Sequence, residues 1–84
     1  MKYRFEKIYD SEDDVRAYKL GRFYLIKHYY WNNNYEWLIQ KDKEWLGFDS
    51  EISRGLENGT IEFGHSCKAG KERLIELYEQ EANA

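Results

Sequence analysis

Two neighbouring segments that are apolar on both of their predicted faces constrain this chain more than any other feature. RFYLIKHYYW (22–31) alternates so that Phe23 and Leu25 share one face while Tyr24 and Ile26 share the other. YEWLIQK (35–41) follows shortly after and reads as a second strand. Strands with two apolar faces are normal only where both faces of a sheet are covered. A chain of 84 residues has little material with which to cover them.

Three consecutive asparagines connect these two segments. Asparagine tolerates positive φ and bonds to its own backbone, so residues 32–34 predict the loop of an antiparallel hairpin. KYRFEKIY (2–9) predicts a further strand, with Tyr3, Phe5 and Tyr9 on one face. A short fourth strand is expected over 60–63, and residues 43–48 are expected to extend a sheet edge or to begin a loop.

The clearest predicted helix covers residues 67–81 and is capped by Ser66. Its apolar stripe is expected to contain Cys67, the stem of Lys71, Leu74, Ile75 and Tyr78, with Glu72, Glu76 and Glu79 on the opposite side. A shorter helix is expected over 50–57, capped by Asp49 or Ser50. The capping-box spacing of Ser11 and Asp14, with Gly21 beyond, predicts a short helix or a turn over 12–20.

These elements predict a single α+β domain over residues 1–84. We expect an antiparallel sheet of three to four strands, with the C-terminal amphipathic helix packed on one face and one or two short helices. The only cysteine cannot form an internal disulfide, which fits a reducing compartment. The first ten residues are too charged for a signal peptide, and no apolar run is long enough to span a membrane. We therefore expect a cytoplasmic protein that does not contact a membrane.

No motif in the sequence indicates catalysis. GHSCKAGKE (64–72) lies where a phosphate-binding loop would be, but its spacing is one residue too long and Glu72 replaces the required hydroxyl. Cys67 is expected to be inert packing and His28 a packing residue, because neither has the partners of a nucleophile pair. One cysteine and two histidines do not make a zinc site. We expect no enzyme activity, no cofactor and no metal.

Aromatic residues make up 18% of the chain, and a core this small cannot enclose all of them. Rings left on the surface in a contiguous patch mark an interaction site, and tyrosine and tryptophan dominate binding hot spots. The predicted partner-binding residues are the rings and amides around the hairpin loop and the acidic cluster near the N-terminus: Tyr30, Trp31, Asn32, Asn33, Asn34, Tyr35, Trp37, Glu12, Asp13 and Asp14.

Two functional hypotheses remain open. The first is a non-catalytic protein-binding module whose acidic patches steer it to a basic partner, such as a nucleic-acid-binding enzyme. In size, ring content and lack of catalytic motifs the chain resembles short accessory proteins of phages and mobile elements, many of which inhibit a host nuclease or defence complex. Alternatively the acidic residues are only solvated surface. The second sheet face could likewise be closed by residues 43–48, by the short helices or by a homodimer.

The second hypothesis is a nucleic-acid-binding domain that stacks bases on the ring face. Lysine and arginine residues near the predicted strands would contact phosphates: Lys19, Arg22, Lys27, Lys41 and Lys43. The formal net charge of −3 and the absence of a basic stripe in the sequence make this the less favoured reading.

Overall fold

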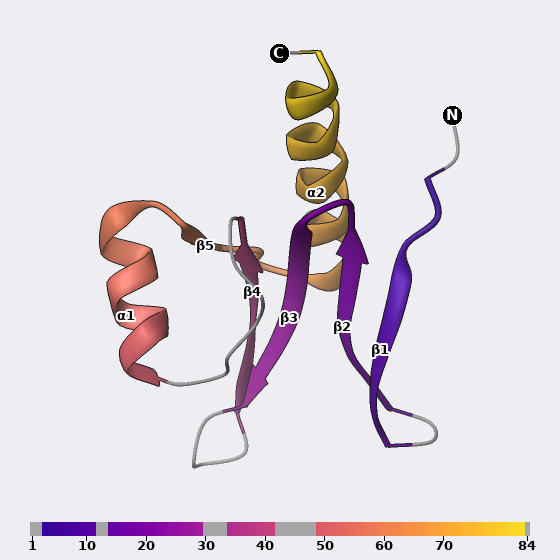
Figure 1. The fold of residues 1–84 in the computed structure, drawn as a ribbon. Coiled ribbons are helices and arrows are strands. Elements are labelled where there is room, and N and C mark those ends of the chain that lie inside the picture. The colour runs from indigo at the N-terminus through magenta and orange to yellow at the C-terminus, as the bar shows by residue number, and fades with distance from the viewer. Residues whose placement is uncertain (1–2, 12–13, 30–33, 42–48, 84) are drawn as a thin grey trace.

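The structure is a computed structural model that describes residues 3–11, 14–29, 34–41 and 49–83. Within this part of the chain, five antiparallel strands form one sheet in chain order, and two helices pack against it (Figure 1). The elements are β1 (Glu6–Ser11), β2 (Asp14–Leu20), β3 (Phe23–Tyr29), β4 (Tyr35–Gln40), α1 (Asp49–Asn58), β5 (Ile61–Phe63) and α2 (Cys67–Ala82). The α+β class is confirmed, but the sheet has five strands rather than three to four.

The additional strand is β2, which lies where the sequence predicted a short helix or a turn. Tyr18 pairs with Lys7 of β1 on one side and with Leu25 of β3 on the other. Pairing with two neighbours supplies the backbone with more hydrogen bonds than one isolated helical turn could. The capping signal of Ser11 and Asp14 was therefore outweighed by tertiary contacts. Residues 12 and 13 lie outside the described residues.

The remaining predicted elements are present with shifted ends. β3 begins at Phe23 because Gly21, with a φ of 63°, turns the chain between β2 and β3. The two helices and the short strand β5 lie close to their predicted ranges. The predicted loop at 32–33 and the segment 43–48 lie outside the described residues.

Helix α2 covers the sheet face that carries Leu25 and Ile39, and it runs behind the upper part of the sheet in Figure 1. The Ser66 hydroxyl caps it by accepting a hydrogen bond from the Ala69 N–H at 3.1 Å. The core cluster on this face consists of Leu20, Phe23, Leu25, Ile39, Leu74 and Leu77.

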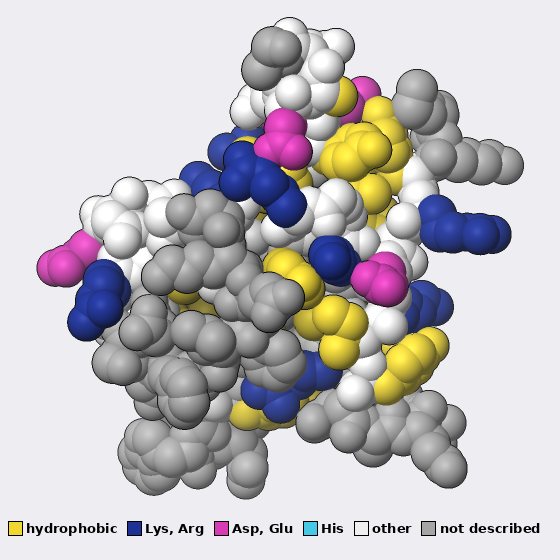
Figure 2. Space-filling view, in the orientation of Figure 1, with side chains coloured by type: hydrophobic (Ala, Val, Ile, Leu, Met, Phe, Trp, Pro, Cys, Tyr) yellow, Lys and Arg dark blue, Asp and Glu magenta, His cyan; other side chains and the backbone are white. Residues whose placement is uncertain are grey.

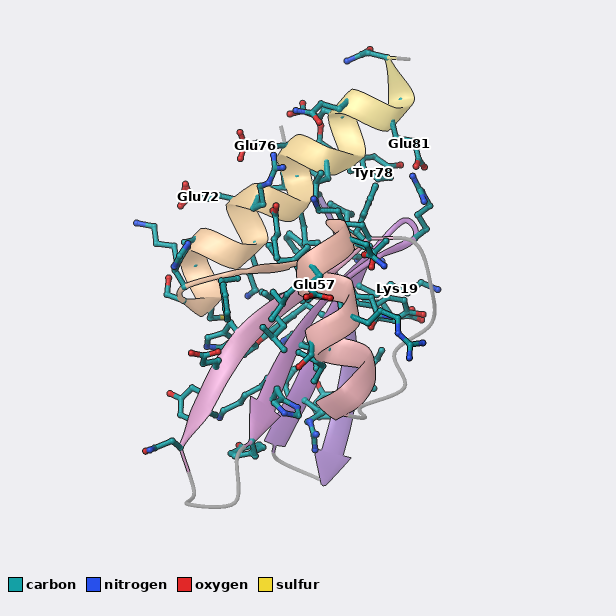
Figure 3. All side chains as sticks on the ribbon, turned by 90° about the vertical axis from the view of Figure 1, so that its left-hand side faces the viewer. Lys19, Glu57, Glu72, Glu76, Tyr78 and Glu81 are labelled. Carbon is teal, nitrogen blue, oxygen red and sulfur yellow. The ribbon has the colours of Figure 1, made fainter. Side chains whose placement is uncertain are left out.

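The buried stripe of α2 differs from the predicted one. Gly70, Leu74 and Leu77 are its buried residues, so of the predicted stripe only Leu74 is fully enclosed. Tyr78 instead packs edge-on against Tyr3 of the N-terminal segment, with ring centroids 5.7 Å apart. The predicted acidic side is confirmed as exposed, and Figure 3 shows Glu72 and Glu76 pointing away from the sheet.

Both faces of the central strands are buried. Ala17, Ile26 and Leu38 lie opposite one another in β2, β3 and β4, so their side chains share the face away from α2, and all three are buried. At the edge of the sheet, α1 approaches β5 closely, since a Cβ at Gly55 would contact Ile61. Among the described residues, the middle of the face opposite the helix is therefore core.

Glu62 ties the edge strand β5 to the helix and to the end of β4. Its carboxylate accepts a hydrogen bond from Arg73 of α2 and lies 3.2 Å from the ammonium of Lys41. Burial by itself would raise the pKa of Glu62, but the hydrogen bonds from Arg73 and Lys41 outweigh it, and the pKa is lowered. The ionised carboxylate is thus the form that holds β5 in place.

We predict that Gly70→Ala destabilises the fold although alanine favours helices. A Cβ at Gly70 would overlap the side chain of Leu25, which is fully buried. Overpacking of this kind costs about 1–3 kcal/mol, against a helix-propensity gain of about 1 kcal/mol. Urea unfolding should therefore show a net loss. The loss should shrink in a Leu25→Ala background, because the two sites are coupled; an unchanged loss there would contradict the close approach.

We predict that Glu62→Gln lowers stability near neutral pH and has less effect in acid. A carboxyl group whose pKa is lowered by folding contributes stability above its unfolded value of 4.5, and that contribution is lost as the pH falls through its folded pKa. Urea unfolding of wild type and variant should therefore converge as the pH is lowered. Glu72→Gln, on the exposed side of α2, is the control. A difference that is constant with pH would refute this account.

Candidate functional site

Beyond the N-terminus of α2, four aromatic rings from three strands form a connected cluster on the helix-covered side of the sheet. We call this cluster of Tyr18, Tyr29, Tyr35 and Trp37 the ring surface. Its centroids lie 6.2 Å apart for Tyr18 and Trp37, 6.4 Å for Trp37 and Tyr35, and 5.8 Å for Tyr35 and Tyr29. Tyr35 is 50% exposed and Tyr29 is 37% exposed.

The strand register explains why these rings lie together. Tyr29 pairs with Tyr35, and Lys27 pairs with Trp37, so all four side chains project from the same face of β3 and β4. Tyr18 of β2 pairs with Leu25, two residues before Lys27, and so reaches the same face. The helix leaves this end of the face open because α2 begins at Cys67 and runs toward the other end (Figure 1).

Three cationic side chains from three elements lie over these rings. The Lys27 ammonium is 4.5 Å from the centroid of Tyr35, and the Lys71 ammonium of α2 is 4.0 Å from that of Tyr18. The Arg16 guanidinium of β2 is 5.5 Å from the centroid of Tyr29. Cations at these distances are attracted to the ring faces. The ring surface therefore combines aromatic area with positive charge, although the chain as a whole has a net charge of −3.

The opposite face of the sheet has a different character. Figure 2 shows that face, on which cationic, acidic and hydrophobic side chains are interspersed across the described part. The acidic residues Glu72 and Glu76 lie on the outer side of α2 (Figure 3). Lys71 therefore lies at the rings although it belongs to the same helix as these two carboxylates.

Tyr18 is the most enclosed ionisable ring of the surface. Burial raises the pKa of its phenol, and a hydrogen bond with Cys67 adds to this effect, while the nearby Lys27 opposes it. The phenol therefore stays protonated at neutral pH and acts as a packing and hydrogen-bonding group. Cys67 is half-buried beside it at the start of α2.

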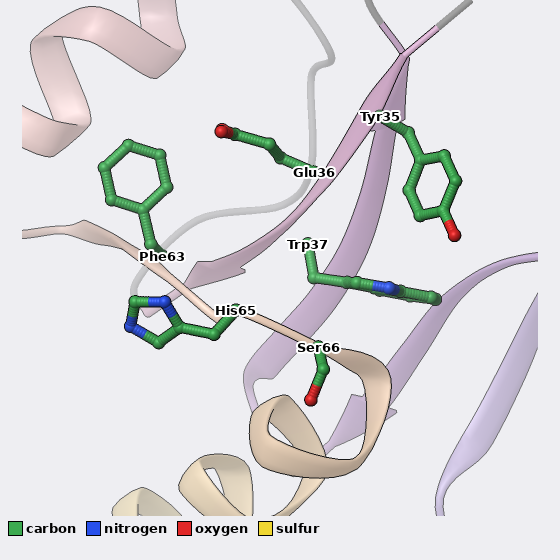
Figure 4. Close-up of a pocket in the computed structure, with 6 residues that line it drawn as sticks. All are labelled: Tyr35, Glu36, Trp37, Phe63, His65 and Ser66. Atoms are coloured by element: carbon green, nitrogen blue, oxygen red, sulfur yellow. The ribbon is translucent and has the colours of Figure 1, made fainter.

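A hollow of about 410 Å³ adjoins the ring surface at the outer edge of β4. Figure 4 shows its lining: Tyr35, Glu36 and Trp37 from β4, Phe63 at the end of β5, and His65 and Ser66 before α2. Phe63 is 48% exposed. His65 has a φ of 68°, and this left-handed conformation turns the chain away from the edge and into the helix.

The structure places only part of the predicted site. Tyr35 and Trp37 belong to the ring surface, Asn34 is exposed immediately before β4, and Asp14 begins β2. The other predicted residues lie outside the described residues: Glu12, Asp13, Tyr30, Trp31, Asn32 and Asn33.

The sequence did not predict two rings of the ring surface, Tyr18 and Tyr29, or two of the cations that lie over the rings, Lys71 and Arg16. Tyr18 was predicted to lie in a short helix or a turn, and Lys71 was predicted only as part of the apolar stripe of a helix. Tyr29 could have been found, because a hairpin centred on Asn32 brings Tyr29 opposite Tyr35. No comparable signal in the sequence brings Arg16 to the same rings.

The described residues contain no group of three histidine, cysteine, aspartate or glutamate side chains placed to hold a metal ion. His28 is buried within the sheet, as expected for a packing residue. In the same part of the chain, neither helix has the length and apolar character needed to cross a membrane.

Comparisons of the chain with protein-family models, with curated proteins and with solved structures found no match.

Proposed function

We propose that this protein is a non-catalytic binding module that docks a macromolecular partner on its ring surface. The observation that carries the proposal is the connected cluster of four rings at the end of the sheet where α2 begins, of which Tyr29 and Tyr35 are the most exposed members. Contiguous aromatic patches of this kind mark interaction sites, and tyrosine, tryptophan and arginine are the residue types that dominate binding energy.

A protein is the first candidate partner. Lys27, Arg16 and Lys71 favour a partner that presents negative charge where it meets the rings. The acidic cluster at residues 12–14 would then contribute long-range electrostatic attraction to basic regions of the partner that do not contact the rings. A small inhibitor that covers part of a host nuclease or defence complex would use a surface of this type.

We predict that the double variant Tyr29→Ala/Tyr35→Ala loses its partner while remaining folded, because the rings are 37% and 50% exposed and neither belongs to the core cluster. Each ring at a hot spot contributes about 2 kcal/mol, so capture of the partner should fall by more than about tenfold. The measurement is quantitative mass spectrometry of proteins captured from a native lysate of the organism that carries the chain.

The control for this experiment is Tyr24→Ala. Tyr24 lies on the opposite sheet face and also has a lysine over its ring, since the Lys19 ammonium is 5.4 Å from its centroid. Capture should be unchanged in this variant. Equal capture by wild type and by the double variant would remove the ring surface as the docking site.

A single strand of nucleic acid is the second candidate partner. The specific observation in its favour is that three cations lie close to the rings, since bases stack on aromatic rings and phosphates contact lysine and arginine. The cationic residues are scattered along the sequence and form no basic stripe there. The fold brings three of them, Arg16, Lys27 and Lys71, to the rings.

If this second candidate holds, affinity for a fluorescent oligodeoxythymidine should fall with salt. Three phosphate contacts predict a slope of log K against log salt of about −2. Arg16→Gln/Lys27→Gln should reduce the magnitude of that slope by about 1.4, since each contact contributes about 0.7. Lys19→Gln, on the opposite face, is the matched control and should leave the slope unchanged. Anisotropy that does not change with added protein at low salt would eliminate this candidate.

A further inference from the structure

The outer edge of β4 is paired along only part of its length. β5 has three residues and pairs with Leu38, Ile39 and Gln40. The last bond on this side is the one that the Gly64 N–H donates to the Trp37 carbonyl at 2.8 Å. Tyr35 and Glu36 belong to β4 but lie beyond the reach of β5, and none of the described strands pairs with them on this side.

The hydrogen bond from the Gly64 N–H to the Trp37 carbonyl shows in which direction the backbone groups at this edge point. Successive residues of an antiparallel strand direct their N–H and C=O alternately to the two neighbouring strands. Because the Trp37 carbonyl points to the β5 side, the N–H and C=O of Tyr35 point to that side as well, while those of Glu36 point to β3. Tyr35 thus presents a donor and an acceptor at an edge with no described neighbouring strand.

The space beside this edge matches an extended chain. The hollow of about 410 Å³ runs along Tyr35, Glu36 and Trp37 and ends where His65 and Ser66 lead into α2 (Figure 4). It falls within the range of about 300–1,000 Å³ that is typical of ligand sites. Tyr35 and Trp37 border it on one face of the sheet, and Glu36 and Phe63 border it on the other.

The outer edge of β1, at the other side of the sheet, contrasts with this one. The pairing of β1 with β2 is interrupted by two register shifts, between Ile8 and Tyr9 and between Tyr9 and Ser11, and β1 carries the charged residues Glu6 and Lys7. Irregular pairing and charge are the usual protection against strand addition. The β4 edge differs in that its pairing with β5 has no register shift, and at Tyr35–Trp37 it carries one charged residue, Glu36, beside the exposed rings of Tyr35 and Phe63.

From these observations we propose that the β4 edge at Tyr35–Trp37 binds an extended peptide of the partner by strand addition. The peptide alternates acidic residues, which face the ring surface, with apolar residues, which face Phe63. The acidic preference follows from Lys27, whose ammonium lies over the Tyr35 ring and so projects from β3 onto β4. An added strand would lie about 4.8 Å beyond β4, which brings a glutamate side chain within reach of that ammonium. This inference rests on the proposed function, because it specifies that the partner is a protein and that it binds through an extended acidic peptide.

The test uses a short capped peptide of alternating Glu and Val, with two control peptides. One control replaces every Glu by Lys, and the other is methylated on alternate backbone nitrogens so that it cannot donate to a neighbouring strand. Calorimetry should give each control an affinity at least about tenfold weaker than that of the parent peptide. In NMR exchange measurements the parent peptide should slow hydrogen exchange of the Tyr35 amide at least about tenfold.

Variants of the protein separate the edge from the rings. Tyr35→Ala removes the ring but keeps the outward N–H, whereas Tyr35→Pro removes both, and proline is tolerated at the first residue of a strand. Peptide binding to Tyr35→Pro should therefore be at least about tenfold weaker than binding to Tyr35→Ala. Tyr35→Phe keeps both the N–H and the ring and should bind as wild type does. If Tyr35→Pro does not fold, as judged by its NMR spectrum, the methylated peptide still tests the same hydrogen bonds.

The outcomes distinguish failure of this inference from failure of the proposed function. Equal binding of the parent and methylated peptides, with loss in Tyr29→Ala/Tyr35→Ala, would overturn strand addition and leave ring docking intact. Protection of the Tyr35 amide that rises with protein concentration alone would assign the edge to a second copy of this chain. Protection by oligodeoxythymidine but not by peptide would assign the surface to nucleic acid. Absence of peptide binding up to millimolar concentration would overturn the inference outright.

Discussion

The close approach of α2 to the sheet at Gly70 is the contact on which the rest of the structure depends. With no Cβ at this position, the helix lies directly against the side chain of Leu25, and Leu74 and Leu77 then complete the core with Ile39. The helix starts at Cys67, near the middle of the sheet, and runs to one end of it (Figure 1). One half of this face therefore becomes core, and the other half keeps its rings at the surface.

That division also sets the charge of the exposed half. Arg16, Lys27 and Lys71 come from β2, β3 and α2, and each lies over a ring of the exposed cluster. The carboxylates of Glu72 and Glu76 lie on the far side of the helix (Figure 3). A chain with a net charge of −3 thus gathers three cations at its rings, and attraction between cations and ring faces helps to hold that arrangement. The adjoining edge of β4 adds backbone donors and acceptors to the same region.

Much of the fold could be predicted because its signals are local. Residues close together in the sequence specify the alternating pattern of β3 and the short strand β5. The same is true of the serine cap of α2 and of its acidic outer side. β2 could not be predicted in this way. Its first residues carry a capping signal, whereas its strand state comes from pairing with β1 and β3, which are separate segments. The site was predicted at Tyr35 and Trp37, and it was missed at Tyr18, which belongs to β2.

The sequence by itself determined that the chain is a small α+β domain with more rings than its core can enclose, because composition and hydrophobic period are properties of the chain alone. Only the tertiary structure decided which rings remain exposed. The strand register brings Tyr29 opposite Tyr35, and the starting point of α2 determines how far the helix reaches over them. Both depend on contacts between distant segments, since cross-strand pairing and helix–sheet packing select partners that no local pattern specifies.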